Sequence, residues 1–325
     1  MNMADKVLEK IDEKKNPCVV GLDPVVEKIP EHLLKGDTFE DVANAFREFN
    51  YAIIDSVYDL VPCVKPQVAF YEKYGSVGLQ AFKDTVDYAH SKGLIVIEDG
   101  KRNDITTTAQ AYADGHLGKA KTKESELASL DVDLLTVSPY LGSDGLTPFV
   151  DVCKKYNKGV FILAKTSNPG SGEWQDRLID LTNEEQQELR AIGIKLEKQR
   201  TTLYNLVALR INKYAQECKG KSGYSSIGAV VGAQFPAQAI TLRKIMSNSI
   251  FLVPGYGAQG GTANELVNCF NEDGYGAVVN SSRGIIYSYG KTDDAKNFAG
   301  CARKSTQLMI ADICGALKNK GKYNH

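Results

Sequence analysis

The sequence has no excess of charge of either sign and no hydrophobic run long enough to cross a membrane. Its 39 Lys and Arg residues balance 40 Asp and Glu residues, which gives a formal net charge of −1. Like charges do not gather in blocks, and this argues against non-specific nucleic-acid binding and against a polybasic membrane-surface protein. No stretch reaches the ~18 consecutive apolar residues that a membrane-spanning helix requires. We therefore expect neither nucleic acid nor a membrane as a partner.

Cysteine and histidine are too scattered to suggest a disulfide framework or a metal site. The 7 cysteines include no C-x-x-C pair, a pattern typical of reduced, buried thiols. The 4 histidines show no metal-ligand spacing, and no G-x-S-x-G motif is present to suggest a serine hydrolase. Residues 1–17 are rich in acidic side chains, unlike a secretory signal. We expect a cytoplasmic protein without a bound metal.

The sequence does contain a repeated alternation of short apolar runs and helical patterns. With 43% hydrophobic and 24% charged residues, its composition is that of an ordinary globular protein. Continuous apolar runs are typical of strands buried on both faces of a parallel sheet. Eight strand–helix repeats predict an α/β fold of the (β/α)8 type, a TIM barrel, with a doubly wound sheet as the second choice. The eight runs are residues 18–22, 62–65, 94–98, 134–137, 160–164, 227–231, 250–253 and 277–280.

One interval, residues 165–226, is too long for a single barrel helix. Thr182 and Glu185 form a capping box within it, and apolar residues at helical spacing continue to about Cys218. The segment has too little apolar surface to close a core of its own. We therefore expect one domain, residues 1–325, with a helical insertion after the fifth strand around residues 171–226.

The polar residues that end the predicted strands are the candidate site, because barrel enzymes place their active sites there. Asp23 ends the first run, Lys65 ends the second, and Asp99, Lys101 and Asp104 follow the third as D-x-K-x-x-D. Side chains alternate along an extended chain, so Asp99 and Lys101 should point into one pocket. A lysine held between carboxylates stays protonated and can donate a proton. By itself, the D-x-K-x-x-D motif would be interpreted as a surface ion-pair network. The additional charges of Asp23 and Lys65, at two other strand ends, favour an active site instead.

A glycine-rich segment follows the seventh run. Gly255, Gly257 and Gly260 match the dinucleotide motif G-x-G-x-x-G, but the acidic residue expected about twenty positions later is missing. In a barrel, glycine-rich loops after strands seven and eight bind phosphate through backbone N–H groups. Tight turns alone would explain the glycines, but not Gln259 or Arg283 beside them. We therefore favour a phosphate site, to which Arg283 adds a charged fork.

Five motifs, in this order, resemble those of the orotidine 5′-phosphate decarboxylases, and the Lys-Arg pair after Asp99 resembles their longer second subtype. The resemblance runs from about Cys18 to Tyr287. It implies a (β/α)8 homodimer that converts orotidine monophosphate to UMP and CO2 in de novo pyrimidine synthesis, without a metal or organic cofactor. The motifs are GLDP at residues 21–24, KPQVAFYE at 65–72, D-x-K-R-x-D-I at 99–105, KTSNPG at 165–170 and PGYGAQGG at 254–261.

The resemblance also implies roles for individual residues. Lys101 would protonate C6 of the pyrimidine, flanked by Asp99 and by Asp104 of the neighbouring subunit, and Lys65 would complete the charged array. Many relatives carry a glycine before the arginine that Arg283 matches, where this chain has a serine. The implied binding roles are ribose for Asp23, Lys65 and, across the interface, Thr108; the base for Ser167; and the phosphate for Gln259 and Arg283.

Three alternatives remain open from the residues alone. Sugar-phosphate decarboxylases and synthases of the same barrel group share D-x-K-x-x-D and use Mg²⁺. A Schiff-base aldolase would use Lys65 or Lys101, and a catalytically inactive barrel would only bind nucleotides. The charged residues agree with the decarboxylation that the resemblance implies, because losing CO2 leaves an anionic ring carbon. A fixed ammonium beside that carbon stabilises the transition state more than the ground state.

Overall fold

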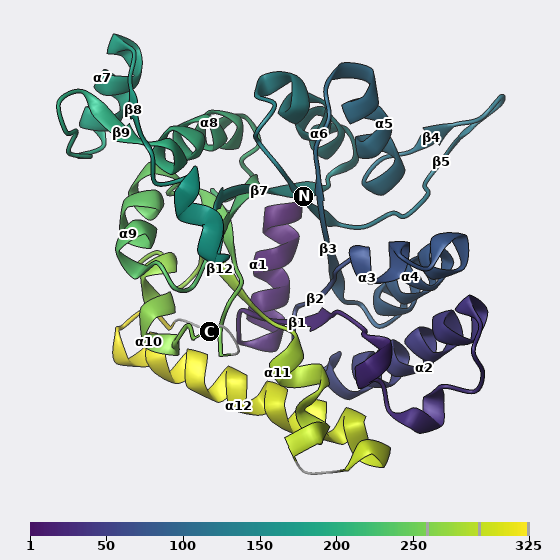
Figure 1. The fold of residues 1–325 in the computed structure, drawn as a ribbon. Helices are drawn as coiled ribbons and strands as arrows, with labels where there is room; N and C mark the ends of the chain where they lie inside the picture. Colours follow the sequence, from purple (N-terminus) through teal and green to yellow (C-terminus); the bar gives the residue numbers. More distant parts are fainter. Residues whose placement is uncertain (258–259, 292–293, 324–325) are drawn as a thin grey trace.

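Eight parallel strands form a closed barrel surrounded by helices (Figure 1). The computed structural model describes residues 1–257, 260–291 and 294–323. Around the barrel the strands follow the order β1-β12-β11-β10-β7-β6-β3-β2, so the predicted (β/α)8 architecture is confirmed. The barrel strands are β1 (Cys18–Leu22), β2 (Cys63–Pro66), β3 (Ile95–Arg102), β6 (Leu134–Val137), β7 (Gly159–Lys165), β10 (Ser225–Val231), β11 (Ser249–Val253) and β12 (Ala277–Ser281).

Helices connect successive strands and cover the outside of the barrel. Every residue of β1, β6, β10, β11 and β12 is buried, as the continuous apolar runs predict for strands with a packed interior and a helical cover. Over the described part of the chain, no helix is long and apolar enough to cross a membrane. The covering helices are α2 (Phe39–Val57), α4 (Gly75–Ser91), α5 (Thr106–His116), α6 (Ser143–Tyr156), α8 (Leu203–Glu217), α9 (Pro236–Ile245) and α12 (Phe298–Asn319); shorter helices α3 (Ala69–Glu72), α10 (Ala263–Leu266) and α11 (Arg283–Ile286) follow β2, β11 and β12.

The first helix, α1 (Met3–Lys14), closes the N-terminal end of the barrel. Figure 1 shows it at the centre of the ring of strands. Its buried side chains, among them Met3 and Val7, pack with interior residues such as Phe161. The backbone N–H of Met3 donates to Oγ of Ser226, at the start of β10, over 3.2 Å. This end of the barrel is therefore filled by protein side chains.

The segment between β7 and β10 departs from the sequence prediction of one continuous helix. Helix α7 (Asn183–Ala191) begins at the predicted capping box, but it does not continue to Cys218. Gly193 has a φ of +76°, and Lys198 and Gln199 also have positive φ. A left-handed backbone conformation ends an α-helix, so the apolar spacing alone was misleading here.

Much of this long segment lies outside the repeating barrel pattern. It begins with a short turn of helix, η3 (Pro169–Glu173), and continues into a pair of antiparallel strands, β8 (Leu178–Asp180) and β9 (Arg200–Thr202), that flank α7. Helix α8 then packs against β7 and β10, in the place of a barrel helix. A second, smaller hairpin, β4 (Ala120–Lys121) with β5 (Glu126–Leu127), projects from the side of the barrel near α5 (Figure 1).

Candidate active site

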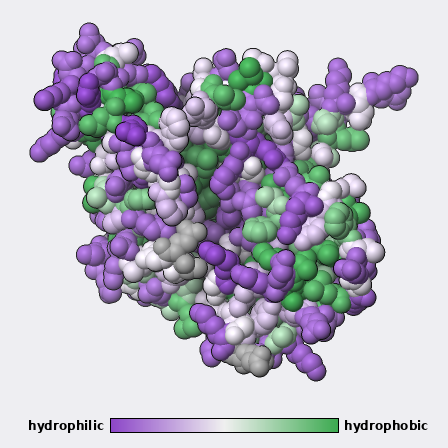
Figure 2. Space-filling model, in the orientation of Figure 1, coloured by the Kyte–Doolittle hydropathy of each residue, from purple (hydrophilic) through white to green (hydrophobic). Residues whose placement is uncertain are grey.

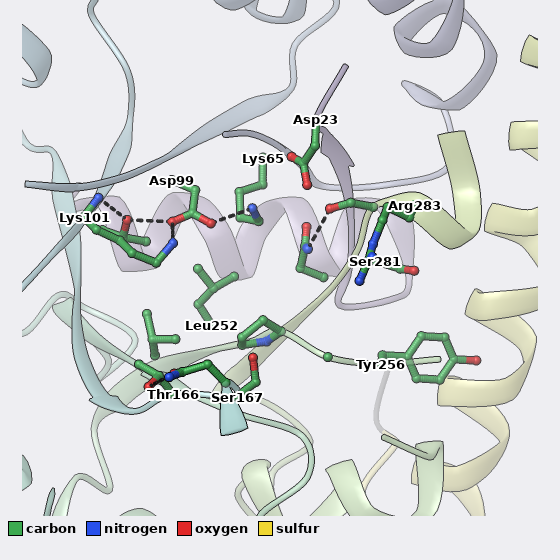
Figure 3. A pocket seen from close by; sticks show the side chains of 17 residues that line it. Asp23, Lys65, Asp99, Lys101, Thr166, Ser167, Leu252, Tyr256, Ser281 and Arg283 are labelled. Atoms are coloured by element: carbon green, nitrogen blue, oxygen red, sulfur yellow. Dashed lines mark hydrogen bonds and ion pairs between the residues drawn. The ribbon is translucent and has the colours of Figure 1, made fainter. Parts of the chain in front are cut away.

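A cavity of about 250 Å³ opens at the C-terminal ends of the barrel strands. Figure 2 shows this face of the molecule hollowed near its centre, and Figure 3 shows the side chains that line the cavity. Six of the residues predicted from the sequence lie on its wall, although they come from distant parts of the chain. They are Asp23, Lys65, Asp99, Lys101, Ser167 and Arg283.

Asp99 lies between two lysine ammonium groups (Figure 3). Its Oδ2 is 3.0 Å from Nζ of Lys65, and its Oδ1 is 2.5 Å from Nζ of Lys101. The hydroxyl of Thr136 donates a third hydrogen bond, of 3.0 Å, to Oδ1. The carboxylate is thereby fixed at both oxygens, and so are the two ammonium groups that contact it.

Burial and neighbouring charges have opposite effects on the pKa values of Asp99 and Lys65, and the effect of the charges is the larger. Burial on its own would raise the pKa of Asp99, but the positive charges of Lys65 and Lys101 and their hydrogen bonds lower that pKa well below its usual value. Burial would likewise lower the pKa of Lys65, but the carboxylates of Asp99 and Asp23 raise it. Asp99 and Lys65 therefore stay ionised at neutral pH.

A bulge at the end of β3 aims Lys101 into the cavity. Glu98 pairs with Leu135 and Arg102 pairs with Val137, so β3 advances four residues while β6 advances two. Within the bulge Lys101 adopts a φ of +45°, a left-handed conformation that is uncommon outside glycine and often marks functional sites. Asp99 and Lys101 do share one pocket, but the predicted simple alternation along a strand is not the reason.

Thr136, in the middle of β6, supports this bulge and was missed by the sequence analysis. Its hydroxyl accepts a 2.9 Å hydrogen bond from the backbone N–H of Lys101 and donates one to Asp99. The fourth apolar run ends without a charged residue, and a threonine inside a strand is common for reasons of β propensity alone. Only the pairing of β3 with β6 shows its place beside the site.

Two acceptor oxygens on the cavity wall are buried without a hydrogen-bond partner among the described residues. They are Oδ1 of Asp23 and Oδ1 of Asn280. The Asp23 backbone is held in place, because the hydroxyl of Tyr287 donates a 2.9 Å hydrogen bond to its carbonyl oxygen. Unpaired buried acceptors are costly, and a ligand with hydroxyl donors would satisfy both of them.

Near Arg283 and Tyr256, two glycines allow neighbouring segments to approach closely. Gly255 has a φ of +98°, and a Cβ there would lie 2.5 Å from the Gln234 side chain. A Cβ on Gly21 would lie 1.8 Å from Oγ of Ser282, next to Arg283, the first residue of α11. Arg283 thus presents a guanidinium on the cavity wall beside closely packed backbone, an arrangement suited to an anion. Gln259, predicted to bind phosphate, lies outside the described residues.

Asp104 and Thr108 do not line the cavity of their own chain. Oδ1 of Asp104 accepts a 2.8 Å hydrogen bond from the backbone N–H of Ile105. Thr108, in the first turn of α5, is exposed. It borders a separate groove of about 640 Å³ that Leu79 and Tyr112 also line. Within one chain, then, the structure separates these two predicted site residues from the other six.

The cavity as a whole suits a hydroxyl-bearing anion with two charged ends. Lys101, with its side chain 48% exposed, presents an ammonium at one side, and Arg283 presents a guanidinium at another (Figure 3). Within residues 1–257, 260–291 and 294–323, no three His, Cys, Asp or Glu side chains are grouped so that they could hold a metal ion.

Known proteins resemble this chain over nearly its whole length. Residues 19–298 match the family described as Orotidine 5′-phosphate decarboxylase / HUMPS family. Orotidine 5′-phosphate decarboxylase of Rhodopirellula baltica is 42% identical over 91% of this chain and 93% of its own; that of Clostridium tetani is 38% identical over 98% and 100%. The OMP decarboxylase structure from Leishmania donovani has a TM-score of 0.68 at 27% identity, covering 97% of this chain and 99% of its own. The chain belongs to the orotidine 5′-phosphate decarboxylase family.

Proposed function

We propose that this protein is an orotidine 5′-phosphate decarboxylase, a carboxy-lyase that converts orotidine monophosphate to UMP and CO2 in pyrimidine biosynthesis. The observation that carries this proposal is the Lys65, Asp99 and Lys101 array on the wall of a cavity that also holds Arg283. Membership of the family and the names of the relatives support it.

Lys101 serves as the proton donor in this proposal. The bond between C6 and the carboxylate carbon breaks, CO2 leaves, and the electron pair remains on C6. A proton from Nζ of Lys101 then forms the new C6–H bond, and solvent returns a proton to the lysine. The ammonium group stabilises the negative charge that develops on C6, and it does so more strongly in the transition state than in the ground state.

Asp99 and Lys65 keep that ammonium in place. Asp99 holds Nζ of Lys101 at 2.5 Å, and the buried Lys65 holds the other carboxylate oxygen. Because the groups are fixed before the substrate arrives, little reorganisation is needed as charge develops. The remaining contacts bind the substrate away from the reacting carbon. We assign the ribose to Asp23 and Lys65, the base to Ser167, and the phosphate to Arg283 and Gln259.

We also propose that the active form is a homodimer. Asp104 and Thr108 lie outside their own cavity, and Thr108 borders a separate groove. Ile105, between them, is 45% exposed, and Tyr112 and Leu79 are each 36% exposed. A second copy related by a two-fold axis would cover these apolar side chains, and would bring Asp104 and Thr108 to the neighbouring cavity.

A cytoplasmic location fits the same proposal. The 7 cysteines, all within the described residues, form no disulfide, and 6 of them are buried, which is the state expected in a reducing compartment. The substrate and product are both phosphorylated nucleotides, which are made and used inside cells.

An absorbance assay with orotidine monophosphate tests the proposed function. Conversion to UMP should proceed at the same rate with and without EDTA, and Lys101→Ala protein prepared in parallel should show almost none. The Mg²⁺-dependent sugar-phosphate enzymes of the same barrel group are not favoured, because the relatives quoted above carry the decarboxylase name. Activity on sugar phosphates that EDTA abolishes, with none on orotidine monophosphate, would show that this alternative is correct.

A further inference from the structure

The segment that follows β7 turns back and holds the cavity wall through one side chain, that of Gln175. Its Oε1 accepts a 3.0 Å hydrogen bond from the backbone N–H of Thr166, and its Nε2 donates a 2.8 Å hydrogen bond to the Thr166 hydroxyl. That hydroxyl donates in turn to Oδ1 of Asn168 over 2.7 Å. Thr166, Ser167 and Asn168 all line the cavity, whereas Gln175 is not part of its lining.

A buried lysine anchors the same segment. Lys165, the last residue of β7, has a fully buried side chain. Its Nζ lies 2.7 Å from Oδ1 of Asp176 and 3.2 Å from Oγ of Ser171, and 4.4 Å from the centre of the Phe235 ring. A buried ammonium is strongly destabilising without a partner. Both polar partners come from the segment after β7, so its position is coupled to the end of that strand.

The backbone of the segment is fixed as well. The N–H of Gln175 donates to the carbonyl of Ser171 over 3.0 Å, and the N–H of Tyr204 donates to the carbonyl of Gln175 over 3.1 Å. Ser167 is also confined from its other side, where a Cβ on Gly232 would lie 3.0 Å from its Cα. Gln175 is therefore held at its backbone while its side chain fixes the residue next to Ser167.

We propose that Gln175 is a positioning residue for the nucleobase side of the cavity, and that the Lys165–Asp176 ion pair anchors it there. This inference rests on the proposed function, in which Ser167 contacts the base. In this proposal the segment after β7 determines the positions of Thr166 and Ser167 on the cavity wall. The sugar and phosphate contacts, at Asp23 and Arg283, do not depend on it.

Binding of two ligands separates this role from a general structural one. UMP carries the base, whereas ribose 5-phosphate has the sugar and phosphate only. By titration calorimetry, Gln175→Ala should bind UMP about ten-fold more weakly, because small misplacements of binding groups cost this much or more. Its affinity for ribose 5-phosphate should match the wild type. Gln175→Glu keeps an acceptor for the Thr166 N–H but loses the donor to its hydroxyl, so its UMP affinity should lie in between.

Gln187→Ala is the matched control, because Gln187 is an exposed glutamine of α7 in the same segment. It should bind both ligands as the wild type does. Equal weakening of UMP and ribose 5-phosphate in Gln175→Ala, or wild-type affinity for both, would overturn the inference. If Gln175→Ala does not fold, the same comparison with Gln175→Glu decides.

Turnover of orotidine monophosphate distinguishes this inference from the proposed function. If the wild type decarboxylates it and Gln175→Ala has an unchanged kcat/KM, the positioning role is wrong and the proposed function stands. If the wild type has no decarboxylase activity but Gln175→Ala loses UMP selectively, the proposed function is wrong and the positioning of a base stands. If the wild type has no decarboxylase activity and Gln175→Ala shows no selective loss of UMP binding, both proposals are wrong.

Discussion

Nζ of Lys101 lies 2.5 Å from Oδ1 of Asp99, only two residues earlier in the chain. Lys101 makes this contact from within the bulge of β3, where its φ is +45°. In a regular strand the two side chains would point to the same face, with their Cα atoms about 7 Å apart. The local distortion thus brings a donor and its fixed counter-charge together at the mouth of the barrel.

Replacing Lys101 should abolish turnover and leave the fold intact. The Lys101 side chain is 48% exposed, so Lys101→Ala removes little packing. The proton donor and the positive charge beside C6 are both lost, and kcat should fall by about three orders of magnitude or more. Steady-state kinetics with orotidine monophosphate, together with circular dichroism, measures this. Near-normal turnover in a folded Lys101→Ala protein would disprove the assignment.

Thr136→Val should lower kcat while binding of UMP changes little. The substitution keeps the shape of the side chain but removes the hydrogen bond to Asp99 and the one from the Lys101 N–H. Loss of such fixed contacts should cost about 1 to 3 kcal/mol in the transition state. Thr241→Val, on α9 and away from the cavity, is the control. A kcat equal to that of the control would show that the bulge does not need Thr136.

The pH dependence of stability should reveal the paired state of Asp99. Its pKa is lowered in the folded protein, so its stabilising contribution is complete above the unfolded pKa of about 3.9. That contribution is lost as the pH falls toward the lower folded pKa. Asp99→Asn should therefore be less stable than the wild type at pH 7, by about 3 kcal/mol, because it leaves the buried ammonium of Lys65 without its partner. Urea unfolding should show this difference shrinking below pH 4, and a difference independent of pH would contradict the pairing.

Arg283→Ala should weaken ligands that carry a phosphate and leave the nucleoside nearly unaffected. The side chain stands at the start of α11, on the cavity wall, where its guanidinium can form paired hydrogen bonds to phosphate oxygens. Titration calorimetry with UMP and with uridine measures the two effects separately. Equal weakening of UMP and uridine would mean that Arg283 supports the structure of the site and does not bind the phosphate.

The barrel could be predicted from the sequence because its strands are buried on both faces and therefore form continuous apolar runs. Asp23, Lys65 and Asp99, chosen because they end or follow predicted strands, line one cavity in the structure. Periodicity failed where single backbone conformations decide the structure. It predicted neither the end of α7 before Gly193 nor the bulge at Lys101. A positive φ at a single residue does not change the spacing of apolar residues, so periodicity cannot detect it.

Contacts between segments that are distant in the sequence could not be predicted from it either. Thr136 became part of the site only through the pairing of β3 with β6. Gln175 reaches Thr166 because η3 turns the chain back after β7. Neither residue ends an apolar run or belongs to a charged motif, and their importance depends on tertiary packing alone.

Mixing two inactive variants tests whether the site is shared between subunits. Asp104 does not line its own cavity, and in the proposed dimer it completes the neighbouring one. Lys101→Ala and Asp104→Ala proteins should each be nearly inactive. A mixed dimer has one cavity that lacks both residues and one in which both are intact. With random exchange about half of the dimers are mixed, so about a quarter of all sites should regain activity.

Subunit exchange has to be verified independently, for example by native mass spectrometry of subunits with tags of different mass. Asp131→Ala serves as the control partner for Asp104→Ala, because Asp131 lies at the opposite end of the strands, just before β6. That variant should be active by itself, and its mixtures should follow simple dilution. If exchange is complete and the Lys101→Ala and Asp104→Ala mixture stays as inactive as its components, then Asp104 does not act in the neighbouring site. Full activity of Asp104→Ala alone would lead to the same conclusion, since a residue that the site needs cannot be removed without loss.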